Sequence, residues 1–181
     1  SSSPGHCSPG AEAAGERVRE MKIPPKALSR AAALQPGGPV TTRFLAPHPT
    51  VLQVGSTVFA HGGLLPQHVR HGLENINRET SEWMRGGGEM YGPWFLQGRD
   101  AVVWTRHYSL QREEQCDCEL LRRSLGMIRG AERMVVGHTV QPEGINGACG
   151  GRVFRVDVGM SKGVTDGAPQ VLEILGDGRE V

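Results

Sequence analysis

The sequence has little of what marks several large classes of protein. Only four of its 181 residues are cysteine, and none forms a CxxC pair, so neither a disulfide framework nor a cysteine-based zinc site is expected. No apolar run approaches the roughly 20 residues of a transmembrane helix. Lys and Arg (20) nearly balance Asp and Glu (19), which removes the electrostatic basis for a nucleic-acid or anionic-membrane partner.

Glycine and proline are abundant instead, with 26 and 12 residues. This excess indicates many turns and argues against a helical bundle or coiled coil, which favours a mixed α/β protein. Residues 1–20 begin with a Ser-, Pro- and Gly-rich stretch without an initiator Met, a secretory signal or a transit-peptide pattern. We expect them to be a disordered lead or a fragment end, followed by one globular part at 21–181.

Hydrophobic periodicity predicts the elements of that part. Apolar residues recur at helical spacing from Val69 to Trp83. The expected helices cover 11–23, 26–34, 69–83 and 120–128, and the expected strands cover 51–54, 57–60, 101–104, 134–136, 152–158 and 171–175.

Two of the predicted strands end in a histidine next to glycine. They are Val-Phe-Ala-His61-Gly-Gly and Met-Val-Val-Gly-His138-Thr. A strand end fixes an imidazole in space, glycine allows close approach, and two neutral imidazoles from adjacent strands can share a divalent metal ion. The alternative, which stays open on residue logic alone, is a pair of buried histidines bonded to backbone carbonyls.

Arg106 follows the apolar run that ends at Trp104. A guanidinium at the end of a buried strand can bind phosphate through two parallel hydrogen bonds, although a surface salt bridge is the commoner role. Asp157 lies within an apolar strand pattern and suits a structural acceptor or a partner to a ligand histidine. Cys116 and Cys118 are incidental thiols or a redox pair. The remaining histidines are expected to be solvated (His6, His48, His68, His71 and His107).

These motifs resemble the calcineurin-like metallophosphoesterases, and among them the Shewanella-like protein phosphatases of the PPP type. The blocks with the His-Gly-Gly at 61–63 and the Gly-His at 137–138 carry the resemblance, with Val-Val-Trp-Thr-Arg106 between them. Further similar stretches lie at 36–39, 72–83 and 137–161. The likeness extends from about residue 26 to the end of the chain.

The resemblance implies the C-terminal part of an α/β metallophosphoesterase β-sandwich flanked by helices. It makes His61 and His138 metal ligands and Arg106 the phosphate-binding residue, which overrides the salt-bridge reading. Such enzymes hold two divalent ions (Mn, Fe or Zn) and hydrolyse phosphomonoesters, here on phosphoserine or phosphothreonine proteins. The compartment stays open: we expect a soluble protein of either the cytoplasm or an organelle.

Three blocks of that family, GDxHG, GDxxDRG and GNHE, are not present in the sequence. They supply most metal ligands and the general-acid histidine, so no catalytic acid is assigned here and little turnover is expected of this chain alone. The strands present would expose apolar surface unless a partner chain covers it. Two alternatives remain: an inactive pseudophosphatase or interaction module, and a dinucleoside-polyphosphate hydrolase.

Overall fold

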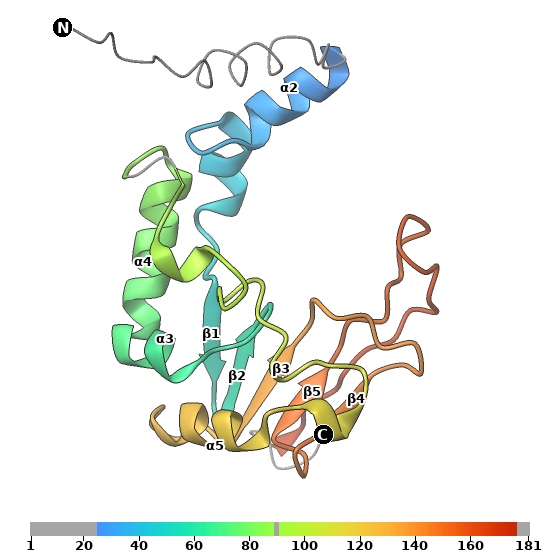
Figure 1. Cartoon of the computed structure of the whole chain (residues 1–181). Coiled ribbons are helices and arrows are strands. Elements are labelled where there is room, and N and C mark those ends of the chain that lie inside the picture. The colour runs from blue at the N-terminus through green and yellow to red at the C-terminus, as the bar shows by residue number, and fades with distance from the viewer. Residues whose placement is uncertain (1–24, 89–90, 177–181) are drawn as a thin grey trace, which may run out of the picture.

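The computed structural model describes residues 25–88 and 91–176, and the predicted lead at 1–20 and helix at 11–23 lie outside them. Five strands and several helices follow one another along the chain (Figure 1). The α-helices are α2 (Pro25–Leu34), α3 (Pro66–His71), α4 (Leu73–Met84) and α5 (Cys118–Gly126). A short π-helix, η1 (Thr41–Leu45), and two 3-10 helices, η2 (Trp94–Leu96) and η3 (Glu113–Gln115), lie between them. The strands are β1 (Val51–Val54), β2 (Thr57–Ala60), β3 (Arg133–Val136), β4 (Asn146–Ala148) and β5 (Val153–Arg155).

The strands form one mixed sheet in the order β1-β2-β3-β5-β4. The pairs β2–β3 and β3–β5 are parallel, with Ala60 opposite Val136 and Val136 opposite Arg155. The outer pairs β1–β2 and β4–β5 are antiparallel. Because parallel strands end at the same edge of a sheet, the segments after β2, β3 and β5 leave it side by side.

The two faces of the sheet have different surroundings. Helices α3, α4 and α5 lie on one face, and their apolar sides complete a core with Val58, Met134 and Val153 (Figure 1). The period-2 alternation of a strand sends Leu52 and Val54 to the other face, where they are 46% and 58% exposed. The α/β class is confirmed, and the described residues contribute one sheet with an open apolar face.

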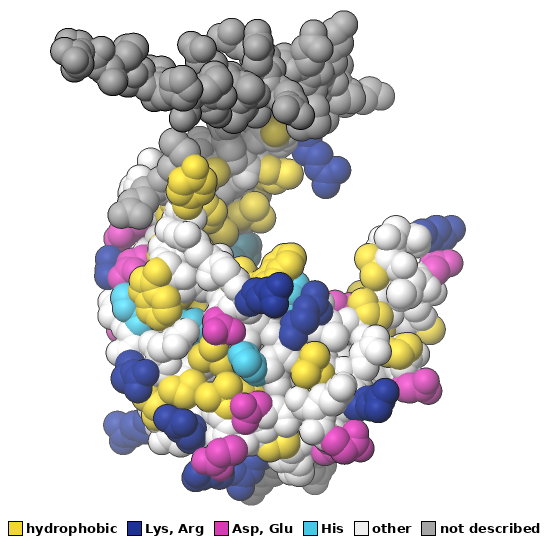
Figure 2. Space-filling view, viewed as in Figure 1, with side chains coloured by type: hydrophobic (Ala, Val, Ile, Leu, Met, Phe, Trp, Pro, Cys, Tyr) yellow, Lys and Arg dark blue, Asp and Glu magenta, His cyan; other side chains and the backbone are white. Residues whose placement is uncertain are grey.

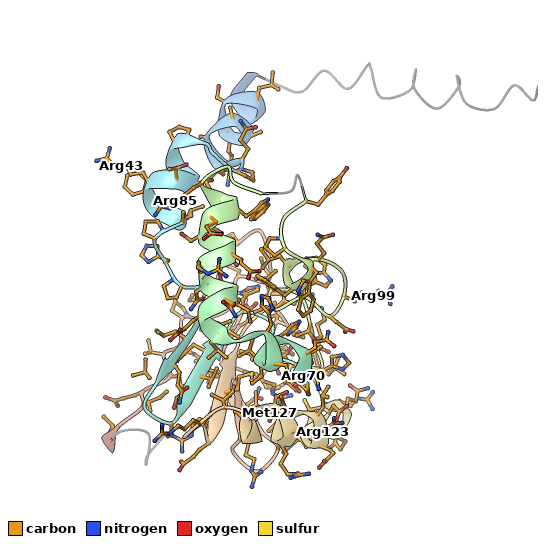
Figure 3. The ribbon with its side chains drawn as sticks, turned by 90° about the vertical axis from the view of Figure 1, so that its left-hand side faces the viewer. Arg43, Arg70, Arg85, Arg99, Arg123 and Met127 are labelled. Carbon is orange, nitrogen blue, oxygen red and sulfur yellow. A yellow bond between two sulfur atoms is a disulfide. The ribbon has the colours of Figure 1, made fainter. Side chains whose placement is uncertain are left out.

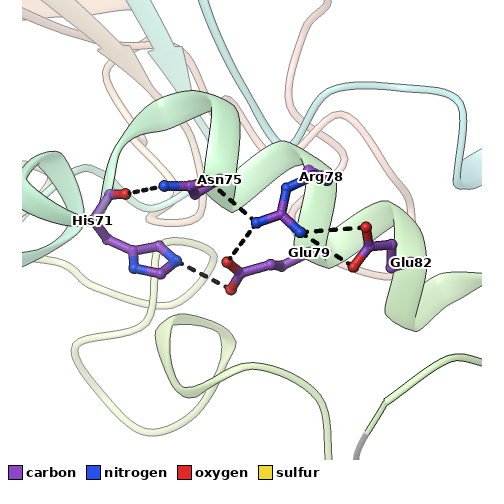
Figure 4. A network of polar contacts seen from close by, with 5 residues as sticks. All are labelled: His71, Asn75, Arg78, Glu79 and Glu82. Carbon is purple, nitrogen blue, oxygen red and sulfur yellow. Dashed lines mark hydrogen bonds and ion pairs between the residues drawn. The ribbon is translucent and has the colours of Figure 1, made fainter.

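The predicted helix at 69–83 is two helices, α3 and α4, which meet at Gly72. Its φ of +97° is a conformation that side-chain-bearing residues rarely adopt, so the helix breaks there despite its continuous apolar periodicity. A polar network spans the break (Figure 4): His71 Nε2 lies 3.0 Å from Glu79 Oε2, and Arg78 contacts Glu79 and Glu82. His71 is therefore held by a carboxylate and is not simply solvated.

Two strand predictions were wrong, and a third was right in place but too long. Residues 101–104 form a turn in which Trp104 N donates to Ala101 O at 2.9 Å, so the backbone hydrogen bonds are local. Residues 171–175 form no strand, and Val171 is 91% exposed because nothing pairs with it among the described residues. The strand expected at 152–158 is only three residues long, and β4, its antiparallel neighbour, was not predicted.

The sequence left Cys116 and Cys118 as either incidental thiols or a redox pair, and the structure shows a different arrangement. Cys118, at the start of α5, forms a disulfide with Cys149, which follows β4. Cys116 is a buried free thiol whose Sγ faces the carbonyl oxygens of Tyr108 and Leu110. A Cys116–Cys118 redox pair is therefore excluded in this structure, and the Cys118–Cys149 disulfide ties α5 to the far edge of the sheet. Within the described residues, no helix is long and apolar enough to cross a bilayer.

Candidate functional site

The two strand-end histidines meet above the carboxyl edge of β2 and β3. His61 Nε2 lies 3.3 Å from His138 Nδ1, and the ring centroids are 5.1 Å apart. The parallel register of the strands produces this proximity, and Gly137 N donates to His61 O at 2.9 Å to extend it beyond the sheet. The structure thus brings together the two residues predicted as metal ligands. The 3.3 Å between the two nitrogens is short enough for a hydrogen bond between the imidazoles.

His138 adopts an unusual backbone conformation. Its φ is +65°, in the left-handed region that residues other than glycine seldom occupy. Strain of this kind persists only where the surroundings fix it, and it concentrates at functional sites. Here the Arg106 Nη1 donates to His138 O at 2.9 Å and to Thr139 Oγ1 at 2.8 Å, so the guanidinium clamps the turn.

A buried polar network supports that clamp. Thr139 Oγ1 lies 2.7 Å from Ser109 Oγ, and Gln141 Nε2 donates to the carbonyl oxygens of Ser109 and Thr139. These side chains are buried, with Ser109 fully inaccessible. None of the three side chains was predicted as part of the site, and the only signal in the sequence is the position of Thr139 directly after the Gly-His pair.

The two glycines after His61 allow the turn at 101–105 to pack closely against the end of β2. Gly62 N and Gly63 N both donate to Val102 O, which brings the turn at 101–105 against the end of β2. A Cβ on Gly62 would lie 2.9 Å from Thr105 N and O, a distance that real Cβ atoms do not show. The two glycines therefore allow the turn that carries Trp104 and Arg106 to lie beside the histidines.

The electrostatics of the site favour neutral His138. Burial lowers the pKa of this imidazole, and the positive charge of Arg106 and the neighbouring His61 lower it further. Asp157 acts in the opposite direction. A neutral imidazole keeps a lone pair available for a metal ion or a hydrogen bond.

Asp157 has a local structural role. Its Oδ1 accepts a hydrogen bond from Gly159 N at 3.0 Å, and its carbonyl oxygen accepts one from Gln141 N. Among the described residues, its carboxylate accepts no hydrogen bond from either histidine. Of the two roles predicted for Asp157, the structural one is therefore the one observed.

The described part of the chain supplies only two histidines to the site. Across residues 25–88 and 91–176, no group of three or more His, Cys, Asp or Glu side chains is arranged to hold a metal ion. Nitrogen ligands about 2.0–2.1 Å from one ion lie roughly 3.3 Å apart in a tetrahedral arrangement, which matches the His61–His138 separation. The pair fits a metal as part of a larger ligand set.

His68 corrects another expectation. It is fully buried at the third position of α3, where its Nδ1 accepts a hydrogen bond from Leu65 N at 3.1 Å. Burial lowers its pKa to about 4, with Asp100 opposing the shift and His71 adding to it. This histidine is a structural cap of α3 and not a solvated side chain. His107 lies 3.1 Å from Asp100 and is partly exposed.

Comparison with known proteins gives one relative named as a protein phosphatase and one that is uncharacterized. The chain is 49% identical over 150 residues to Shewanella-like protein phosphatase 2 of Arabidopsis thaliana, which covers 82% of this chain and 38% of that protein. It is 26% identical over 185 residues to an uncharacterized protein of Acanthamoeba polyphaga mimivirus, covering 83% of this chain and 73% of the viral protein. No family model matches the chain.

Two solved structures share the fold. Both are crystal structures of a cold-active protein tyrosine phosphatase, one of them a mutant, each with a TM-score of 0.51 and 20% identity over 63% of this chain. They are covered over 35% and 34% of their own length. The predicted resemblance to Shewanella-like protein phosphatases is confirmed, and the chain spans about two-fifths of the Arabidopsis relative's length.

Proposed function

We propose, on the premise that this chain is related to the Shewanella-like protein phosphatases, that it forms the histidine-bearing part of a metal-dependent phosphoserine and phosphothreonine phosphatase. The observation that carries the proposal is the 3.3 Å approach of His61 Nε2 and His138 Nδ1 at the ends of two parallel strands. Their separation suits two ligands of one divalent ion, for which imidazole nitrogen is a common ligand.

In this proposal the two imidazoles hold one ion of a two-metal centre, with Mn, Fe or Zn as the candidate metals. When bound, such ions polarise the phosphoryl oxygens of the substrate. The chain's own contribution is to keep His138 neutral and to fix its ring through the strained turn at φ +65°. The remaining ligands and the general acid come from polypeptide outside the described residues.

Arg106 is the proposed phosphate-binding residue. Its Nη1 is bonded to the backbone and hydroxyl of 138–139, which fixes the guanidinium directly beside the histidine pair. No other hydrogen bond or ion pair of Arg106 is recorded within residues 25–88 and 91–176, so its other nitrogens are free to donate to phosphate oxygens. A planar guanidinium held in this way recognises two oxygens of a phosphate at once.

The open face of the sheet is the proposed docking place for the polypeptide segment that supplies the other metal ligands. A hollow of about 460 Å³ runs over it and includes His61 in its lining, together with Leu52 and Phe59. A segment that covered this apolar surface would also reach the histidine pair. We therefore expect the other metal ligands to arrive from a chain segment packed on this face, whether in the same polypeptide or in a partner.

A second candidate function is a non-catalytic interaction module. It is favoured by the incomplete ligand set in the described residues and by the exposed apolar sheet face. In that case the same surface binds a partner, and the histidine pair is a hydrogen-bonded remnant.

Metal binding separates the two candidates. Isothermal titration of Zn²⁺ or Mn²⁺ into the chain should give one site, and His61→Ala or His138→Ala should each weaken it at least about tenfold. His48→Ala, an exposed histidine in the loop before β1, is the matched control and should bind like the wild type. Equal affinity for the wild type and both site variants would rule out the metal centre.

Activity provides the second test. This chain alone with Mn²⁺ should hydrolyse an aryl phosphate no faster than His61→Ala, because a complete two-metal site needs ligands that it does not carry. In a protein that joins this chain to the three missing blocks, the same variant should lose at least about a hundredfold in kcat, as expected when a reaction's metal centre is disrupted. An unchanged kcat there would remove His61 from the mechanism.

A further inference from the structure

A hollow of about 440 Å³ opens next to the proposed phosphate-binding arginine. It is lined by Arg99, Asp100, Trp104, Arg106, His107 and Leu110. The carboxylate of Asp100 is already bonded to His107, with Nε2 and Oδ1 3.1 Å apart. Neither arginine has an ion pair with a carboxylate among the residues that the structure describes. The hollow therefore holds two guanidinium groups and one acid that is already bonded.

Trp104 forms one wall of this hollow. Its ring centroid lies 4.8 Å from that of His138, and the residue is 54% exposed. It also lines a neighbouring hollow of about 340 Å³ that is largely apolar and shares Arg99. Trp104 is thus an exposed aromatic side chain that lies beside the proposed metal ligand His138 and lines both hollows. An extended peptide can pack on such a side chain.

Arg99, the second arginine of the hollow, is exposed to solvent. Figure 3 shows its side chain projecting from the loop before the turn at 101–105 towards solvent, well away from Arg70 and Arg123. Figure 2 shows basic side chains gathered beside histidine in the middle of one face, where the surface is hollowed. Two like charges that line one hollow are stabilised when anionic groups lie between them.

From this arrangement we infer that the hollow binds a second anionic group of the substrate, close in sequence to the phosphorylated residue. The inference rests on the proposed function. If Arg106 takes the phosphate that is removed, Arg99 is left to recognise a neighbouring acidic side chain or a second phosphate. Trp104 packs against the peptide between the two anions. Arg99 is in this view a specificity-determining residue and takes no part in the reaction itself.

The test compares fluorescein-labelled phosphopeptides by anisotropy on the whole chain with Mn²⁺. One series has the same phosphoserine flanked by two Ala, two Glu, two Lys or a second phosphoserine, each with its unphosphorylated counterpart. The acidic or doubly phosphorylated peptides should bind about two- to fivefold more tightly than the Ala peptide, the upper part of the range expected for an exposed ion pair. Whichever of the two binds more tightly identifies the source of the second anion.

Arg99→Glu should abolish that gain and favour the Lys peptide, with the Ala peptide unchanged, and Arg99→Gln should abolish the gain alone. Arg70→Glu is the matched control, since it makes the same charge change on the exposed side of α3. Phosphate-dependent binding that is blind to flanking charge, or equal effects of the two Arg→Glu variants, would overturn this inference only. Binding that never depends on phosphate, or that survives Arg106→Ala, would instead overturn the proposed function and this inference with it.

Discussion

Acidification should destabilise this protein through one buried histidine, His68. The residue has no accessible surface, and its Nδ1 accepts the hydrogen bond of Leu65 N at the start of α3. Protonation would place an N–H against an N–H and a charge in an apolar environment. The folded chain therefore excludes a proton that the unfolded chain takes up, and burial accordingly lowers the pKa from 6.5 to about 4.

The sign and the size of the effect follow from this difference. Because the folded pKa is depressed, the penalty is absent above about pH 6.5, grows as the pH falls, and is complete below pH 4. Between pH 7 and pH 5 the linkage relation gives a loss of about 2 kcal/mol in the free energy of unfolding, and the full shift corresponds to about 3 kcal/mol.

Urea denaturation followed by tryptophan fluorescence at pH 7, 6 and 5 measures this loss. His68→Gln is the matched variant, since a glutamine at the third helical position can accept the same backbone N–H and does not titrate. Every other titrating group is common to both proteins, so the difference between their pH profiles isolates His68. Parallel profiles, with no difference of about 2 kcal/mol between pH 7 and pH 5, would refute the reasoning.

Three further predictions concern the packing around the site. Gly62→Ala should lower the free energy of unfolding by at least about 2 kcal/mol, because the new Cβ would collide with backbone atoms of Thr105. The control is Gly163→Ala, whose Cβ would meet only Ser161 Oγ at 3.5 Å and which should change that free energy by less than about 0.5 kcal/mol. Similar losses of stability in the two variants would contradict the packing argument. Thr139→Val should destabilise by about 1–3 kcal/mol, because it removes the hydroxyl that accepts from Arg106 Nη1 and leaves the buried Ser109 hydroxyl without its hydrogen-bond partner. Its control is Thr80→Val, at a buried hydroxyl with no hydrogen-bond partner in the structure, which should be neutral or stabilising. Thermal denaturation measures both variants. A lower melting temperature for Thr80→Val than for Thr139→Val would disprove the role of the network. Reduction of the Cys118–Cys149 disulfide, which closes a separation of 31 residues, should lower the free energy of unfolding by about 3–4 kcal/mol. The double variant Cys118→Ser/Cys149→Ser should show the same lower stability with and without reductant, and a wild type indifferent to reductant would argue that the disulfide contributes nothing.

The strands and helices with an unambiguous period could be predicted from the sequence. Strands β1, β2 and β3 and helix α5 fall close to where alternation and helical spacing put them, because each buries one side of a regular repeat. The break at Gly72 was not predicted. Apolar spacing continues across the glycine, and only the packing of α3 and α4 requires its positive φ.

Short strands without an apolar repeat could not be predicted. Residues 146–148 form β4 because β5 offers an edge for pairing, whereas the more apolar residues 171–175 make only an isolated bridge at Leu175 and form no strand. Pairing is a property of the whole sheet, so composition alone does not decide it.

The sequence by itself determined which residues carry the chemistry: His61 and His138 at strand ends and Arg106 between them, singled out by residue type and by resemblance. Only the tertiary structure decided how they meet. The parallel register of β2 and β3 sets the 3.3 Å approach of the imidazoles, and the turn at 101–105 turns Arg106 back onto the carbonyl oxygen of His138. The tertiary structure also decided that His68 is buried and that Cys118 pairs with Cys149. Burial and disulfide pairing depend on contacts between residues far apart in the chain, which no local sequence pattern encodes.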